Sequence, residues 1–187
     1  MLSTKSVVAA AVAALSLFAA LPSAAQTRGP VFAAFATVCA VPAADFLTVR
    51  KAADAQGWGD SDVKADANMP GVTIADQINR SSTIDKTGVV MSAWHGSKGA
   101  VKVSDCTFHV AKVDFDALRK DAGAWLTFPA QDSSPKRVTF RFTDTDGVHK
   151  ALTPADFDAA AGANGLEILT ITGDANGTVL DLMMIKK

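Results

Sequence analysis

The stretch Arg137-Val138-Thr139-Phe140-Arg141-Phe142 is the clearest β-strand in this chain. Apolar and polar residues alternate strictly along it, so Val138, Phe140 and Phe142 face one side and the residues between them face the other. Such a strand buries one face in a core and leaves the other open to solvent, as antiparallel sheets commonly do. The stretch therefore predicts an antiparallel sheet whose apolar side is covered by other elements.

Five more strands are expected around this one. Asn176-Gly177 is a strong signal for a two-residue hairpin turn, and it joins two apolar runs near the end of the chain. The expected strands are residues 88–95, residues 100–113 (one long strand, or two short ones broken near Ser104-Asp105), a short segment ending near Leu152, and residues 166–172 and 178–185. The last two are apolar on both faces, which predicts either a central strand covered twice or a subunit contact.

Helical spacing of apolar residues predicts four helices between these strands. They are residues 33–39, residues 42–56, a helix capped by Asp114 and a short helix capped by Thr153. The order is two helices and then three hairpins, with one helix between successive hairpins. This order predicts an α+β fold with a mostly antiparallel sheet of about six strands and helices packed on one face. Residues 60–82 show little periodicity and are expected to form a long ligand-contacting loop.

The first 25 residues have the pattern of a cleaved secretory signal. Lys5 is their only charge, residues 7–21 are apolar or small, and Ser23-Ala24-Ala25 offers small residues at the cleavage site. The alternative is a permanent anchor, but the 15-residue apolar run is shorter than the roughly 20 residues that span a bilayer. We therefore expect a signal peptide at 1–25 and one soluble α+β domain at 26–187, periplasmic or secreted.

Charge and cysteine content narrow the function classes. The chain has 18 basic and 19 acidic residues, a balance that predicts neither nucleic acid nor an anionic membrane as partner. Cys39 and Cys106 are the only cysteines, and an even pair in an oxidising compartment predicts one disulfide. The alternative, a redox or catalytic thiol, lacks the C-x-x-C motif that would favour it.

Motifs that would identify an enzyme or a cofactor site are absent. The sequence has no G-x-S-x-G, no H-E-x-x-H and no glycine-rich phosphate loop. We therefore predict no catalytic residue, no metal site and no cofactor.

Alternation instead indicates a locally basic surface on the open sheet face, formed by Lys102, His109, Arg137 and Arg141. Arginine binds carboxylate or phosphate groups with two parallel hydrogen bonds, so this surface predicts an anion site. An ordinary solvated sheet face is the alternative, and Arg137 is expected to contribute less than Arg141.

Three functions remain open on these grounds. The first is an exported, non-enzymatic protein of the cell envelope that binds a small ligand, with an anion as first candidate, or a protein partner. The second is a small hydrolase that uses His95 or His109. The third is an accessory or inhibitory subunit that engages its partner through the apolar C-terminal hairpin.

Overall fold

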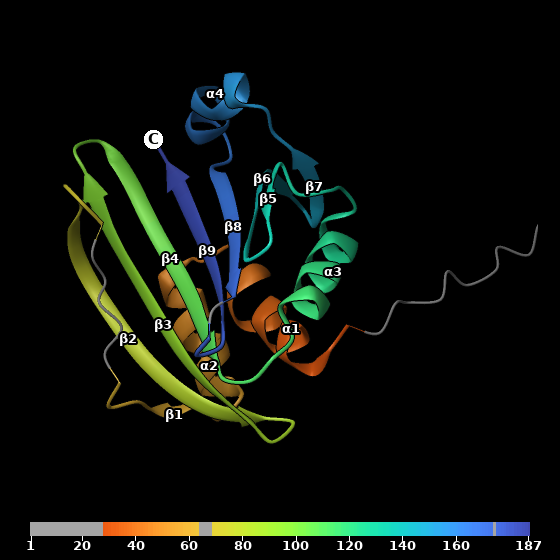
Figure 1. Ribbon diagram of the computed structural model, residues 1–187. Coiled ribbons are helices and arrows are strands. Elements are labelled where there is room, and N and C mark those ends of the chain that lie inside the picture. Colours follow the sequence, from red (N-terminus) through yellow and green to blue (C-terminus); the bar gives the residue numbers. More distant parts are fainter. Residues whose placement is uncertain (1–27, 64–68, 174) are drawn as a thin grey trace, which may run out of the picture.

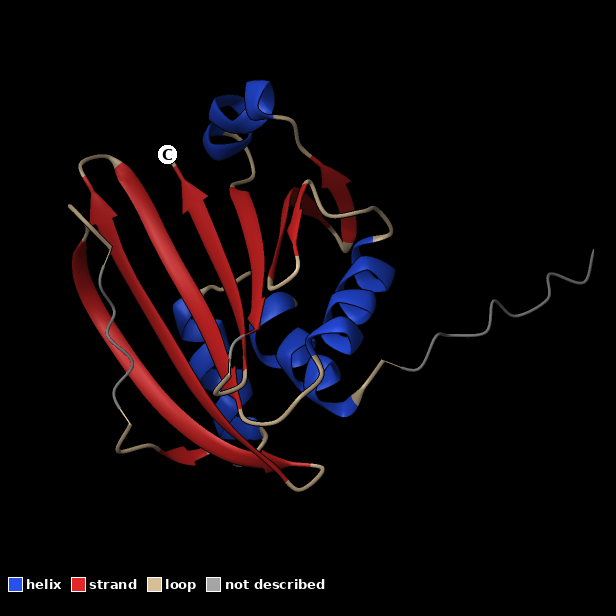
Figure 2. Cartoon of the chain, viewed as in Figure 1, coloured by secondary structure: helices blue, strands red, loops and turns tan. Residues whose placement is uncertain are grey.

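A computed structural model describes residues 28–63, 69–173 and 175–187 of this chain. The predicted signal peptide lies outside the described residues. Within them the chain has an α+β fold built on one large antiparallel sheet (Figures 1 and 2). The strands are β1 (Gly59–Asp60), β2 (Thr73–Ile84), β3 (Thr87–Lys98), β4 (Val101–Val110), β5 (Asp132–Ser134), β6 (Arg137–Thr145), β7 (Val148–Ala151), β8 (Leu166–Gly173) and β9 (Thr178–Lys186).

The order of strands across the sheet is β1-β2-β3-β4-β9-β8-β6-β5, and β7 also pairs with β6. The six strands expected from the sequence correspond to β3, β4 and β6 to β9. The described sheet has nine strands, so the expected number of about six is too low, and β1, β2 and β5 are the additions. The C-terminal strand β9 lies between β4 and β8, so it is central as expected, but it is covered on both faces only near its end.

Strand β2 corrects the prediction that residues 60–82 are irregular. It pairs with β3 from Thr73 to Ile84, with one register shift between Ile74 and Asp76. Both faces of β2 carry polar side chains, such as Asn79 on one side and Arg80 on the other. The apolar alternation that reveals a strand in a sequence is therefore missing, and the backbone pairing with β3 holds the segment instead.

The helices are α1 (Pro30–Phe35), which continues as a π-helical turn (Ala36–Ala40), α2 (Phe46–Ala55), α3 (Phe115–Leu126), and α4 (Phe157–Gly162), which follows a 3₁₀ turn (Pro154–Asp156). Helix α2 begins four residues later than residue 42, where it was expected. Ala43 and Ala44 have positive φ angles of 50° and 52°, which no right-handed helix contains. Asp45 caps the helix by accepting a hydrogen bond from the Thr48 N–H at 3.0 Å.

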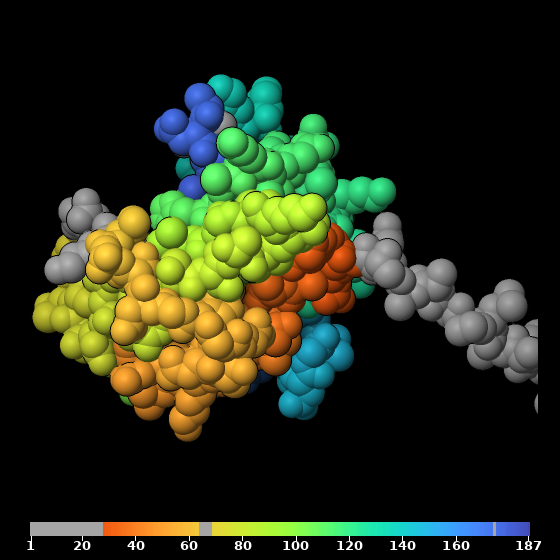
Figure 3. Space-filling model, turned by 90° about the horizontal axis from the view of Figure 1, so that it is seen from below, coloured from red at the N-terminus to blue at the C-terminus, as the bar shows by residue number. Residues whose placement is uncertain are grey.

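Helices α1, α2 and α3 cover one face of the sheet. Figure 1 shows α1 and α2 behind the strands and α3 beside them. In the view from below, the red-to-orange N-terminal helices lie directly against the yellow-green end of the sheet (Figure 3). Phe32 and Phe35 of α1 are fully buried, and the Phe35 ring packs edge-on against Phe108 of β4 at 5.3 Å between centroids. The apolar core therefore lies between this helical layer and the sheet.

The predicted disulfide is confirmed. It joins Cys39 in the π-helical turn to Cys106 in β4, and their Cα atoms are 5.6 Å apart. Both residues are fully buried in the core, so the bond ties the N-terminal helical layer to the middle of the sheet. No helix among the described residues is long and apolar enough to cross a membrane.

Helix α4 departs from the expectation that all helices pack on one face. It contacts the ends of β8 and β9, where Ala160 and Ala161 pack with Leu166, Ile168 and Ile185. Leu166 and Ile168 alternate along β8 with Leu169 of the main core, so they point to the opposite face. Helix α4 therefore covers one end of the face that α1 to α3 leave bare.

Candidate functional site

The bare face of the sheet carries a row of polar side chains, and we call it the open face. Directly paired residues of an antiparallel sheet share a face, so the register shows which side chains lie together. The row crosses six neighbouring strands and consists of Asn79, Ser92, Thr107, Asp181, Thr170 and Thr139. Ser92 and Thr139 are only 2% and 4% exposed. Hydroxyl, amide and carboxyl groups thus form a continuous polar row on the open face, and some of its members are buried among their neighbours.

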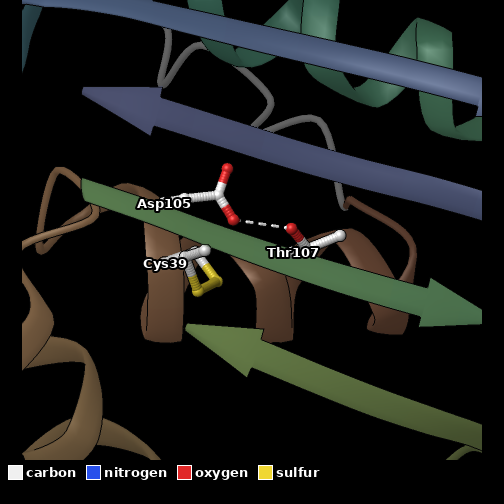
Figure 4. The surroundings of a disulfide bond; sticks show 4 residues. Cys39, Asp105 and Thr107 are labelled. Atoms are coloured by element: carbon white, nitrogen blue, oxygen red, sulfur yellow. Dashed lines mark hydrogen bonds between the residues drawn. A yellow bond between two sulfur atoms is a disulfide. The ribbon is translucent and has the colours of Figure 1, made fainter. Parts of the chain in front are cut away.

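Two carboxyl groups meet near the middle of the polar row, Asp181 within it and Asp105 in the row beside it. Asp105 of β4 is 4% exposed and accepts a hydrogen bond from the Thr107 hydroxyl at 2.8 Å. Figure 4 shows both side chains on one side of β4 and the disulfide on the other. The Asp105 side chain also forms hydrogen bonds with Trp94, its cross-strand partner, and with Asp181 of β9. The sheet therefore holds two acids in contact at its centre.

Burial raises the pKa of both carboxyl groups in this pair. Desolvation raises the pKa of Asp105 well above its usual range, and the neighbouring Asp181 raises it further. Desolvation also raises the pKa of Asp181, while its hydrogen bond with Asp105 and the positive charges of Arg137 and His109 oppose that rise. Asp181 Oδ1 is buried and accepts no hydrogen bond from any described residue. The ionisation of one acid therefore opposes the ionisation of the other, because two adjacent carboxylates repel each other.

His109 and Arg137 flank the carboxyl pair. Register places them on the open face, in the row next to Asp181 and on opposite sides of it. Both side chains are exposed, and both act electrostatically on Asp181. A hollow of about 440 Å³ opens beside His109, and another of about 320 Å³ opens beside Arg137. The open face therefore offers an exposed histidine and an exposed arginine, each next to a depression in the surface.

Arg141 shares the open face but is already engaged. Its guanidinium forms an ion pair with Asp132 at 2.6 Å and lies 5.8 Å from the centre of the Phe157 ring in α4. These contacts fix the side chain between β5 and α4 and neutralise part of its charge. No ion pair of Arg137 is found among the described residues. Arg137 is therefore better placed than Arg141 to meet an anion.

The prediction that Lys102 lies on the open face is wrong. Strand β4 is continuous from Val101 to Val110. Its side chains therefore alternate between the two faces without the interruption near Ser104-Asp105 that would have turned Lys102 to the open face. Lys102 has the same parity as Cys106 and pairs with Ser97 and Lys186 on the helix-covered side. The proposed basic surface thus loses one of its four members, and two acids occupy the centre of that face.

The histidines do not converge on one site. His95 lies on the helix-covered side of β3 and stacks on Phe46 of α2, with 4.7 Å between ring centroids. His149 of β7 contacts Trp125 and Phe142 and lies 3.3 Å from the Asp144 carboxylate. In the described part of the chain, no group of three histidine, cysteine or acidic residues could hold a metal ion.

A further buried acid lies on the helix-covered side of the sheet. Glu167 of β8 is 4% exposed, and its Oε2 atom accepts no hydrogen bond from the described residues. Burial raises its pKa to about 8, with an additional contribution from the nearby Asp144. No hollow described at the surface includes Glu167 in its lining, so this acid is part of the interior.

Comparison with known protein families, with curated proteins and with solved structures finds no match. The open face must therefore be interpreted from its own chemistry. Alternation in the sequence already predicted Thr107 on the open face, but it missed Asp105 and Asp181, although unbroken alternation from Phe108 through β4 would have placed Asp105 there as well. Asp181 stands between apolar residues in β9, and its place beside Asp105 depends on the pairing of β4 with β9.

Proposed function

We propose that this chain is an exported, non-enzymatic protein of the cell envelope that binds a small hydroxylated anion on its open face. One observation carries the proposal: the exposed side chains of His109 and Arg137 lie on either side of Asp181, in the row next to a row of hydroxyl, amide and carboxyl groups on the open face. Buried polar groups that do not serve the core are concentrated at functional sites.

The arrangement of charge indicates how such a ligand would lie. The Arg137 guanidinium suits a carboxylate or phosphate, which it can bind with two parallel hydrogen bonds. An anionic group at the centre would be repelled by the carboxyl pair whenever it is ionised, so the anionic end of the ligand belongs at the rim. Ligand hydroxyls can donate to Asp181 and exchange hydrogen bonds with Thr170 and Thr107. A sugar acid or a hydroxycarboxylate combines both features.

The exported location is supported by the disulfide between Cys39 and Cys106, because such bonds persist in oxidising compartments. It is also supported by the leader-like pattern of residues 1–25. The protein for the binding test should therefore be purified from the exported fraction. Its intact mass should correspond to a chain that begins at Gln26, and a mass that includes residues 1–25 would contradict the export hypothesis.

Titration with gluconate, acetate, phosphate and glucose tests the ligand class, with the NMR shifts of His109 as the readout. Gluconate should bind more tightly than acetate or glucose, and Arg137→Ala should weaken it about tenfold or more, since a hydrogen bond to a charged group contributes that much. Lys136→Ala is the matched control, because Lys136 is an exposed neighbour outside the open face. Equal binding by both variants would contradict the proposal.

A hydrolase is the second candidate, and the hydrogen-bonded pair of carboxyl groups with raised pKa values favours it. Such a pair can act as general acid and base, and His109 lies close enough to Asp181 to influence its pKa. His95, the other histidine considered, lies on the opposite side of the sheet beside Phe46. Turnover of glycoside or ester probes that is abolished by Asp181→Asn would favour this candidate over simple binding.

A further inference from the structure

A second recess lies on the helix-covered side of the sheet, away from the open face. It has a volume of about 350 Å³ and is bounded by the start of α2, the end of β3, the start of β4 and the end of β9. Its cationic lining consists of Lys102 and Lys186, with His95 beside them. Its apolar lining includes Phe46, Leu47 and Met184.

The two lysines are direct cross-strand partners. Lys102 of β4 pairs with Lys186 of β9, so their side chains leave the same face of the sheet side by side. Like charges in this arrangement repel each other. Neither lysine forms an ion pair with any described acid. Asp45 also lines the recess, but its carboxylate is already engaged by the N–H and hydroxyl of Thr48. The lining of the recess therefore keeps a net positive charge, because two lysines face one carboxylate.

The opposite wall of the recess is apolar and in part exposed. Phe46 is 3% exposed and holds the His95 ring against it, with an angle of 29° between the two planes. Leu47 is 63% exposed, although it follows a buried phenylalanine at the start of α2. An exposed leucine beside a recess offers a contact surface for an apolar group. The recess therefore combines an anion-attracting end with an apolar wall.

We propose that this recess binds a small amphiphilic anion, specifically a carboxylate with a short aliphatic chain. The carboxylate would lie between Lys102 and Lys186 and relieve their repulsion. The aliphatic chain of the ligand would lie along Phe46, Met184 and Leu47, where its apolar surface is removed from water. This site is separate from the open face, and it neither requires nor excludes the ligand proposed there.

Calorimetric titration with octanoate tests the site, with acetate and octanol as probes that each lack one of its two features. Octanoate should bind more tightly than either. The double variant Lys102→Gln/Lys186→Gln should weaken octanoate binding by about tenfold or more, because hydrogen bonds to charged groups are lost. The matched control is Lys112→Gln/Lys136→Gln, two exposed lysines at the other end of the sheet.

NMR shifts locate the bound probe. Octanoate should move the resonances of His95 and Phe46 and leave His109 unchanged. Shifts at His109 instead would show that octanoate binds on the open face, and they would contradict the proposal that it binds in the recess. Equal weakening in the control variant, or octanoate binding no better than acetate, would also overturn the proposal.

Discussion

Individual acids of this protein are placed where they resist ionisation. Asp105 and Glu167 are each 4% exposed, on opposite faces of the same sheet. Burial raises the pKa of both, and for Glu167 the value reaches about 8. A folded-state pKa above the unfolded value means that the folded protein holds the proton more tightly. Stability is then greatest below the usual acid pKa and declines as the pH rises toward the raised value.

Asp105→Asn should therefore make stability less dependent on pH. Asparagine keeps an acceptor for Thr107 and can donate to Asp181, but it cannot ionise. We expect the variant to be more stable than the parent at pH 8, and the difference to shrink toward pH 4 as the Asp105 carboxyl group becomes protonated in both states. Denaturant unfolding across this pH range measures it. Asp62→Asn, in an exposed loop, is the control, and parallel pH profiles of parent and Asp105→Asn would contradict the prediction.

At the scale of elements, the pairing of β2 with β3 depends on a close approach at Gly96. A Cβ atom at this position would lie 2.4 Å from the Thr73 carbonyl oxygen and 3.1 Å from the Ile74 Cα. The register shift between Ile74 and Asp76 lies directly beside it. Glycine thus lets the backbone of β2 cross close to β3 where the pairing is irregular.

Gly96→Ala should consequently destabilise the β2–β3 ladder. The methyl group meets backbone atoms that cannot rotate away, so we expect a loss of about 1–3 kcal/mol in the free energy of unfolding. Gly88→Ala is the matched control in the same strand, because a Cβ there has no neighbour within 4 Å. It should be neutral or slightly stabilising. Hydrogen exchange of β2 amides and thermal unfolding measure both variants, and equal effects would contradict the explanation.

At the scale of the whole molecule, the disulfide connects two layers that are far apart in sequence. Cys39 and Cys106 are separated by 67 residues, and the bond joins the N-terminal helical layer to β4. Both sulfur atoms lie within the core formed by Phe35, Phe108 and their neighbours. The helical layer is thereby held against the face opposite the acid pair, which leaves the open face uncovered.

Replacing both cysteines with alanine should lower the melting temperature. Closing a loop of this length stabilises a fold by roughly 4 kcal/mol in the chain-entropy model, which corresponds to a decrease of about 10 °C for a chain of this size. Differential scanning calorimetry measures the change. The parent in reducing agent is the control and should shift in the same direction. An unchanged melting temperature in both would show that packing alone holds the layers together.

The sequence by itself determined the local structure. Alternation of apolar and polar residues located β6, because a strand with one buried face must repeat with a period of two. The Asn176-Gly177 turn located β8 and β9 as the apolar runs on either side of it. Asp114 marked the start of α3 and Thr153 marked the turn before α4, because N-cap side chains satisfy nearby backbone N–H groups. The pair of cysteines likewise predicted the disulfide.

Only the tertiary structure decided which strands lie side by side. Strand β2 carries polar side chains on both faces, so its sequence lacks the alternation of apolar and polar residues that would predict a strand. Asp105 and Asp181 meet because β4 pairs with β9, and Lys102 meets Lys186 through the same pairing. Pairing between distant strands depends on the sum of many weak cross-strand contacts and on the closure of long loops. No local sequence pattern therefore reveals which distant strands pair, and both candidate binding sites depend on that pairing.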